Sequence, residues 1–274
     1  MTVLDRFSMA GKTCLITGAS SGLGRHFSLT LAEAGGVVVV AARRRDKLAD
    51  VVEEITSAGG KAVAVSMDVS DSDSVTEAFD QAEAEVGTID VVLNNAGIVS
   101  RGSSLDMTPD EWDMVMNTNL KAVWRVSQEA ANRLISAGKP GNIINTASIL
   151  SFRVTASNLT YAVSKAGVVQ MTRALALDWA RHNIRVNAIA PGYFETDLNR
   201  DMLQSEHGQT LIKRIPQRRT GEMDELSGPI LLLASDASSF MTGETITVDG
   251  GHLVSSLWGQ INAVCGQLWY QTLL

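Results

Sequence analysis

Short apolar runs and longer amphipathic stretches alternate along the whole chain. The run from Val37 to Ala42 is apolar at every position and rich in β-branched residues, which predicts a strand buried on both faces. The stretch 46–58 after it has helical periodicity and is closed by Gly59 and Gly60, a common helix stop. The same pattern predicts further strands at 12–17, 61–69, 89–93, 142–146, 185–190 and 245–248, and helices at 25–34, 71–86, 108–137, 157–182 and 223–234.

Strands and helices that alternate with short turns predict a parallel sheet with helices on both faces. No internal repeat and no low-complexity linker interrupts the pattern, which favours a single domain. In open sheets of this kind, ligands bind at the carboxyl ends of the strands. Site residues are therefore expected in the loops that follow the predicted strands.

Composition argues against several classes of function. The 274 residues are 45% hydrophobic and carry a formal net charge of -7, which argues against a nucleic-acid or anionic-membrane partner. No apolar run is long enough to cross a bilayer, and the stretch 1–11 lacks a signal-peptide pattern, so a cytoplasmic protein is expected. Two cysteines, Cys14 and Cys265, and four scattered histidines predict neither a disulfide framework nor a metal site.

A glycine-rich turn follows the first predicted strand. Gly18, Gly22 and Gly24 allow a tight turn and a close approach of the backbone to a ligand. The helix behind them offers free N–H groups and the positive end of its dipole, which suit a pyrophosphate. The spacing is neither Gly-x-Gly-x-x-Gly nor a P-loop. A tight turn without a ligand is the alternative, but the position after the first strand favours a dinucleotide site.

Three arginines, Arg43, Arg44 and Arg45, follow the strand 37–42, and no carboxylate precedes Asp46. A carboxylate at this point favours NAD because it accepts hydrogen bonds from ribose hydroxyls, whereas a guanidinium pairs with the 2′-phosphate of NADP. NADP is therefore predicted as the cofactor, with Arg43 best placed to bind its phosphate. The alternative is a solvated, cationic helix start, which is expected for at least one of the three arginines.

Two further strand ends fit a cofactor crevice. Asp68 and Val69 pair a carboxylate with an apolar neighbour, which suits an adenine edge. Asn95, Ala96 and Gly97 are small enough to let the backbone approach the cofactor. Either segment also reads as a simple turn signal.

Tyr161 and Lys165 are four residues apart in the predicted helix 157–182, so both side chains leave one face. A neighbouring cation favours phenolate, which lets a side chain with an ordinary pKa of ~10 act as acid or base near neutrality. The alternative is that Tyr161 and Lys165 are only neighbours on the helix surface, as most Tyr–Lys pairs with this spacing are. Ser148 stands just after the predicted strand 142–146, and no Gly-x-Ser-x-Gly nucleophile elbow surrounds it. Its predicted role is to donate a hydrogen bond to a polarised carbonyl.

Together these motifs resemble those of the short-chain dehydrogenase/reductase family, from about Ala10 to His252. The matching segments stand in the family's order: Thr17–Gly24 (TGASSGLG), Asn94–Gly97 (NNAG), Asn119, Ser148, Tyr161-x-x-x-Lys165 and Pro191-Gly192. The resemblance implies a doubly wound Rossmann fold with a seven-stranded parallel sheet and helices on both faces. One departure concerns the cofactor, because NADP-preferring relatives often have a basic residue where this chain has Ser21.

The resemblance also implies a proton-relay tetrad of Asn119, Ser148, Tyr161 and Lys165. Tyr161 is then the acid/base on the substrate oxygen and Ser148 orients that oxygen. Lys165 lowers the tyrosine pKa and hydrogen-bonds the nicotinamide ribose, Asn119 holds a water that passes protons to it, and the segment 191–196 holds the nicotinamide. The predicted cofactor-binding residues are Gly18, Ser20, Ser21, Gly22, Leu23, Gly24, Arg43, Asp68, Val69, Asn95, Ala96, Gly97, Tyr161, Lys165, Pro191, Gly192 and Thr196.

The predicted organisation is a Rossmann-fold domain over 1–252, with a substrate lid at about 193–220. An extension at 253–274 carries aromatic residues and is expected to dock on a partner subunit or on the lid, because family members commonly form homotetramers. A homo-oligomer is predicted, a tetramer first and a dimer as the alternative. In the segment 149–156, which is expected opposite the lid, Arg153 is the charge nearest Ser148 in sequence, and it faces either an anionic substrate group or solvent.

The predicted function is transfer of a hydride between NADP(H) and a small ketone or secondary alcohol, as in a carbonyl reductase. A 3-oxoacyl-carrier-protein reductase of fatty-acid synthesis is the alternative within the same class. A non-catalytic module that senses dinucleotides is the alternative outside it, and the complete tetrad argues against this one.

Overall fold

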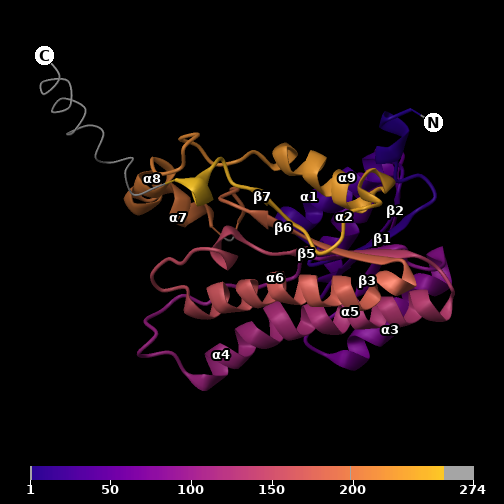
Figure 1. Ribbon diagram of the computed structural model, residues 1–274, viewed down its shortest axis with the longest axis horizontal. Coiled ribbons are helices and arrows are strands. Elements are labelled where there is room, and N and C mark those ends of the chain that lie inside the picture. The colour runs from indigo at the N-terminus through magenta and orange to yellow at the C-terminus, as the bar shows by residue number, and fades with distance from the viewer. Residues whose placement is uncertain (1, 198, 256–274) are drawn as a thin grey trace, which may run out of the picture.

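The computed structural model describes residues 2–197 and 199–255. They form a seven-stranded parallel sheet in the order β3-β2-β1-β4-β5-β6-β7, so the predicted doubly wound fold is confirmed (Figure 1). The winding reverses between β1 and β4, where such folds bind their ligands. The strands are β1 Thr13–Thr17, β2 Val37–Ala42, β3 Lys61–Ser66, β4 Val91–Asn94, β5 Gly141–Thr146, β6 Ile184–Pro191 and β7 Thr245–Val248.

Helices cover both faces of the sheet (Figure 1). They are α1 Gly22–Glu33, α2 Arg45–Ser57, α3 Ser72–Val86, α4 Pro109–Met116, α5 Ala122–Ser136, α6 Leu159–Trp179, α7 Arg200–Gln204, α8 Glu206–Ile212 and α9 Ser227–Ala234. One layer holds α1, α2 and α9, and the other holds α3, α5 and α6. Leu15 and Ile16 are neighbours on β1 but belong to opposite cores, as expected for a strand buried on both faces.

Several elements differ by a few residues from their predicted extent, and two of the differences have a clear cause. The strand predicted at 61–69 ends at Ser66, because the Asp68 carboxylate accepts hydrogen bonds from the N–H and hydroxyl of Ser70 and starts a turn. The helix predicted at 108–137 is instead α4 and α5 joined by a π-helical turn, Asn117–Lys121. A π-helical turn often marks a functional position, and this one contains Asn119.

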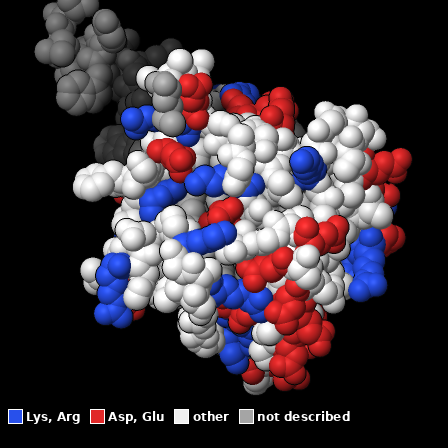
Figure 2. Space-filling model, turned by 90° about the vertical axis from the view of Figure 1, so that its right-hand side faces the viewer, with Lys and Arg blue, Asp and Glu red and all other residues white. Residues whose placement is uncertain are grey.

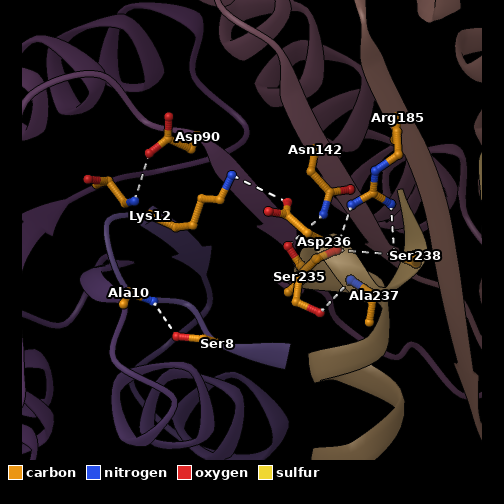
Figure 3. A network of polar contacts seen from close by, with 12 residues as sticks. Ser8, Ala10, Lys12, Asp90, Asn142, Arg185, Ser235, Asp236, Ala237 and Ser238 are labelled. Atoms are coloured by element: carbon orange, nitrogen blue, oxygen red, sulfur yellow. Dashed lines mark hydrogen bonds and ion pairs between the residues drawn. The ribbon is translucent and has the colours of Figure 1, made fainter. Parts of the chain in front are cut away.

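Polar side chains tie the amino ends of β5 and β6 to the end of α9 (Figure 3). Asn142 donates to the carbonyls of Leu233 and Ala234 at 2.7 and 3.1 Å. Arg185 donates to the carbonyls of Leu233 and Ser235, both at 3.2 Å. These bonds satisfy carbonyls that a helix end leaves without partners. The amino end of the sheet is therefore occupied by structural contacts, and the carboxyl end remains for a site.

Basic and acidic side chains lie interspersed on the side of the molecule where the strands begin (Figure 2). Of the helices described, none is long and apolar enough to cross a bilayer. The segment predicted to be a lid contains α7 and α8 and lies at the other end of the sheet (Figure 1). Most of the predicted docking extension, 256–274, lies outside the described residues.

Candidate active site

Ser148, Tyr161 and Lys165 meet at the carboxyl end of β5. Ser148 follows β5 and caps a short 3₁₀ turn, with its hydroxyl accepting a hydrogen bond from the N–H of Leu150 at 3.1 Å. Tyr161 and Lys165 stand one turn apart near the start of α6. The Lys165 Nζ lies 5.8 Å from the centroid of the Tyr161 ring. The shared helix face predicted from their spacing is therefore present in the fold.

Lys165 is a buried cation with one protein hydrogen bond. Its side chain is only 3% exposed, and its Nζ donates to the carbonyl of Thr146 at 2.6 Å. Burial lowers the pKa of Lys165 from its ordinary 10.5 to about 8, because removal from water disfavours the charged form. The ammonium can therefore lose its proton close to neutral pH.

Tyr161 differs from the prediction in the direction of its pKa shift. Burial raises the pKa of Tyr161 above its ordinary 10.0, a hydrogen bond with Ser148 acts in the opposite direction, and the nearby Tyr193 adds to the rise. The predicted net lowering by Lys165 is therefore wrong for the cofactor-free protein. The phenol is held protonated, which suits a group that donates a proton to a carbonyl oxygen.

Asn119 fixes the loop after β4 through its side chain. Its Oδ1 accepts a hydrogen bond from the N–H of Ile98, and its Nδ2 donates to the carbonyl of the same residue, both at 2.8 Å. The Nδ2 also reaches the hydroxyl of Ser164 on α6 at 3.3 Å. A Cβ placed on Gly97 would lie 3.3 Å from the Asn119 Oδ1 and 3.7 Å from the Lys165 Nζ. Gly97 therefore lies between these two members of the tetrad.

The glycine turn packs directly on the predicted Asn95–Gly97 segment. A Cβ on Gly18 would lie 2.9 Å from the Cα of Ala96, and one on Gly24 would lie 2.4 Å from the carbonyl oxygen of Gly18. Gly18 also has φ +66°, in the region that favours glycine. Side chains larger than glycine do not fit at these two positions.

Thr17 joins the two segments, although the predicted site residues do not include it. Its hydroxyl accepts hydrogen bonds from the N–H groups of Asn95 and Ala96, both at 3.0 Å. The Asn95 Nδ2 donates back to the Thr17 carbonyl at 3.1 Å. The signal for Thr17 was a polar residue at the last position of the strand, directly after the apolar run Cys14–Ile16.

The start of α1 offers backbone N–H donors for an anion. Its N-cap residue, Ser21, makes no side-chain capping bond, so the N–H groups of the first turn are left for a ligand. A Cβ on Gly22 would lie 3.5 Å from the methyl group of Thr196, which brings the segment after β6 to the glycine turn. Next to Pro191 at the end of β6, a Cβ on Gly192 would lie 2.8 Å from Asp249.

Arg44, which the sequence prediction ranked below Arg43, makes the contacts with the glycine turn. Its Nη2 donates to the hydroxyls of Ser20 and Ser21 at 2.8 and 3.1 Å. Arg43 is exposed just after β2. It is one of the charges that lower the pKa of Asp68, where the largest effect is the hydrogen bond from the Ser70 hydroxyl.

A cavity of about 100 Å³ lies under the lid segment and is lined by residues of the β6 and β7 ends, among them Tyr193, Phe194 and Asp249. None of Ser148, Tyr161 and Lys165 lines it. Ser148, Tyr161 and Lys165 therefore lie outside this cavity, at the start of α6 and the end of β5.

Comparison with known proteins identifies the family. A family model described as enoyl-(acyl carrier protein) reductase matches residues 18–252. The chain is 40% identical to a 2-dehydro-3-deoxy-D-gluconate 5-dehydrogenase of Escherichia coli over 92% of this chain and 99% of the relative. It is 38% identical to a 3-oxoacyl-[acyl-carrier-protein] reductase of Thermotoga maritima over 90% of this chain and 99% of that one.

Solved structures of similar proteins point to the same family. A short-chain type dehydrogenase/reductase from Mycobacterium marinum is 42% identical with a TM-score of 0.88, covering 92% of this chain and 99% of that chain. A gluconate 5-dehydrogenase from Burkholderia cenocepacia in complex with NADP and tartrate is 39% identical with a TM-score of 0.89, covering 93% and 100%. The chain belongs to the short-chain dehydrogenase/reductase family and is an oxidoreductase of alcohol and carbonyl groups.

Proposed function

We propose that the protein is an NADP(H)-dependent dehydrogenase that interconverts a secondary alcohol and a ketone on a polyhydroxy carboxylic acid. The observation that supports this chemistry is that Ser148, Tyr161 and Lys165 lie together beside the glycine turn. The substrate class is supported by relatives named for gluconate or deoxygluconate dehydrogenation and by the tartrate in the Burkholderia cenocepacia structure.

The residues at the carboxyl edge fit NADP(H). The uncapped start of α1 and the glycine turn would hold the pyrophosphate, and a larger side chain at Gly18 or Gly24 would fill that space. Arg43 and Arg44 would hold the 2′-phosphate. The segments Asp68–Val69 and Pro191–Thr196 would hold the adenine and nicotinamide ends. When bound, the nicotinamide accepts a hydride from the alcohol carbon or supplies one to the ketone carbon.

The protein's own residues handle the proton and the orientation. Tyr161 gives its proton to the carbonyl oxygen in reduction and takes one from the hydroxyl in oxidation. Ser148 donates a hydrogen bond to the same substrate oxygen. Lys165 provides positive charge behind Tyr161, and Asn119 holds the loop that carries Gly97 against Lys165.

A panel of substrates tests this function. With NADP⁺, we expect oxidation of D-gluconate or a related sugar acid, and with NADPH, reduction of the matching keto acid, followed as absorbance of the reduced cofactor. A second candidate, reduction of 3-oxoacyl thioesters, is favoured by the similarity to the Thermotoga maritima reductase. Turnover of acetoacetyl thioesters alone, with no sugar acid oxidised, would replace the first proposal by the second.

Removal of the arginines after β2 is expected to change cofactor preference. Arg44→Ala removes a cation that touches the glycine turn, so NADPH should bind about 10- to 100-fold more weakly, while NADH binding changes little. Arg43→Ala should act in the same direction. Fluorescence titration with both cofactors measures this, with the exposed Arg45→Ala as the matched control. An equal loss of NADPH and NADH binding in either variant would contradict a role in holding the 2′-phosphate.

We further propose a homo-oligomer, a tetramer or a dimer, for the assembled protein. Large apolar side chains are exposed on the helix layer of α4, α5 and α6, namely Met114, Trp124 and Leu177. A monomer mass in light scattering would contradict this. The lid over 193–220, the docking of the extension 253–274 and the cytoplasmic location stay predictions.

A further inference from the structure

Three adjacent strands bring together a second polar group at the edge that carries the tetrad. Arg153 follows the turn after β5, Tyr193 follows β6, and His252 follows β7. These strands are neighbours in the sheet and end on the same side (Figure 1). Ser148 also follows β5, so the group borders the place where the substrate oxygen would lie. None of the three has a role in moving the hydride or the proton.

Direct contacts join these residues. The rings of Tyr193 and His252 are tilted against each other with centroids 5.6 Å apart. The Nη1 of Arg153 donates to the carbonyl of His252 at 2.6 Å. Tyr193 also raises the pKa of Tyr161, after the larger effect of burial. The group therefore acts electrostatically on the proposed proton donor.

His252 has a hydrogen-bonding atom that the described residues leave unused. The residue is only 5% exposed, and its Nδ1 has no partner among them. A buried polar nitrogen without a partner is uncommon and calls for a ligand. Burial lowers the pKa of His252, and Arg153 acts in the same direction, so the ring is neutral at neutral pH. A neutral imidazole offers one donor and one acceptor to such a ligand.

The electrostatic surroundings of this group are positive. Arg153 has no ion pair among the described residues, and one hydrogen bond uses only part of its five-donor guanidinium. Burial raises the pKa of Tyr193, and both Arg153 and Arg101 oppose that rise, so both cations act at the phenol. Arg214 is a third cation, which acts on His252.

The carboxylate that acts on His252 is Asp249, and it is already bonded. Asp249 acts on His252 in the direction opposite to Arg153 and Arg214. Its two oxygens accept hydrogen bonds from the backbone N–H groups of Gly251 and Leu253, at 2.8 and 2.6 Å. Among the charges that act on Tyr193 and His252, three are arginines and one is Asp249, and an anionic ligand would restore the balance.

We propose that Arg153, Tyr193 and His252 form the subsite that binds the carboxylate of the substrate beside Ser148 and Tyr161. A guanidinium with free donors matches the two oxygens of a planar carboxylate. The Tyr193 hydroxyl and the His252 ring supply further hydrogen bonds to the carboxylate or to the adjacent hydroxyl. A neutral polyol would leave the positive charge uncompensated. This inference rests on the proposed function, and it assigns specificity for an acid to residues outside the tetrad.

Kinetics with a charged and a neutral substrate test the subsite. For the best acid of the panel above, with D-gluconate as the first probe, Arg153→Gln should raise KM about 10- to 100-fold with a smaller change in kcat. Reduction of the neutral ketone 2,3-butanedione with NADPH should be unchanged. Arg153→Lys should recover part of the affinity, and His252→Phe, which keeps the ring shape, should raise KM for the acid about 10-fold.

The controls separate the possible failures. Arg173→Gln removes an exposed arginine elsewhere on α6 and should change neither substrate, and the NADPH dissociation constant should stay constant throughout. Equal effects of Arg153→Gln on the acid and on 2,3-butanedione would overturn the subsite and leave the proposed function standing. Absence of turnover with every acid would overturn the proposed function itself.

Discussion

Replacement of Tyr161 by phenylalanine is expected to lower kcat about 10³-fold for both oxidation and reduction, because it removes the only proton donor assigned to the substrate oxygen. The phenol is protonated in the cofactor-free protein, since burial raises its pKa. A water molecule that is not held in position does not replace the phenol efficiently as a proton donor. Steady-state rates with the best sugar acid and its keto acid measure the effect.

Two further measurements make this result specific. NADPH should bind the Tyr161→Phe variant within about threefold of the wild type, because Lys165, the glycine turn and the arginines are intact. Val163→Ala, an exposed position on the same helix, is the matched control and should retain full activity. Wild-type rates in Tyr161→Phe would show that Tyr161 is not the proton donor, and absence of turnover in both proteins would support a protein that binds the dinucleotide without catalysis.

Replacement of Lys165 by methionine is expected to have opposite effects on activity and on stability. The rate should fall about 10²- to 10³-fold, because the variant lacks a buried positive charge behind Tyr161. The cofactor-free variant should nevertheless be more stable than the wild type at pH 7. The pKa of Lys165 falls from 10.5 to about 8 on folding, a difference worth about 3 kcal/mol against the charged form.

The stability gain has a defined pH dependence. Below pH 8 the folded protein holds a charged Lys165 at full cost, and between pH 8 and 10.5 the unfolded chain binds a proton that the folded protein has lost, so wild-type stability rises with pH. The variant also loses the hydrogen bond to the Thr146 carbonyl, worth about 1 kcal/mol. The net gain is then about 2 kcal/mol at pH 7 and close to zero at pH 10.

Urea unfolding of both proteins at pH 7 and pH 10 measures this difference. A variant that is less stable than the wild type at pH 7 would show that the lysine contributes more through its contacts than its burial costs. A confirmed gain would identify Lys165 as a residue kept for catalysis at the expense of stability, which is a common compromise in active sites.

The order of strands and helices was predictable because each element depends on the local pattern of apolar and polar residues. The run Val37–Ala42 is apolar at every position, and β2 has the predicted bounds. Errors appeared where a side chain decided the backbone locally, as at Asp68, whose carboxylate binds Ser70 and ends β3 early. The π-helical turn at Asn119 also escaped prediction, since the helical periodicity continues on both sides of it.

The candidate site was only partly predictable for a different reason. Motif residues such as Gly18 and Ser148 stand at strand ends, and strand ends can be located from the sequence. The contact of Arg44 with Ser20 depends on how two loops pack, and so does the contact of Arg153 with His252. Such contacts join segments far apart in the chain, which periodicity does not relate.

The sequence alone determined the parallel sheet with helices on both faces, the glycine turn after the first strand and the pairing of Tyr161 with Lys165 on one helix face, because these follow from local spacing and from the period of apolar residues. The doubly wound topology came from the resemblance to the family. Only the tertiary structure decided the electrostatics of that pair. The spacing predicted a tyrosine made acidic by its lysine, yet burial raises the pKa of Tyr161 and lowers that of Lys165. Burial depends on what packs around a group, and that is fixed only when the distant strands and helices come together.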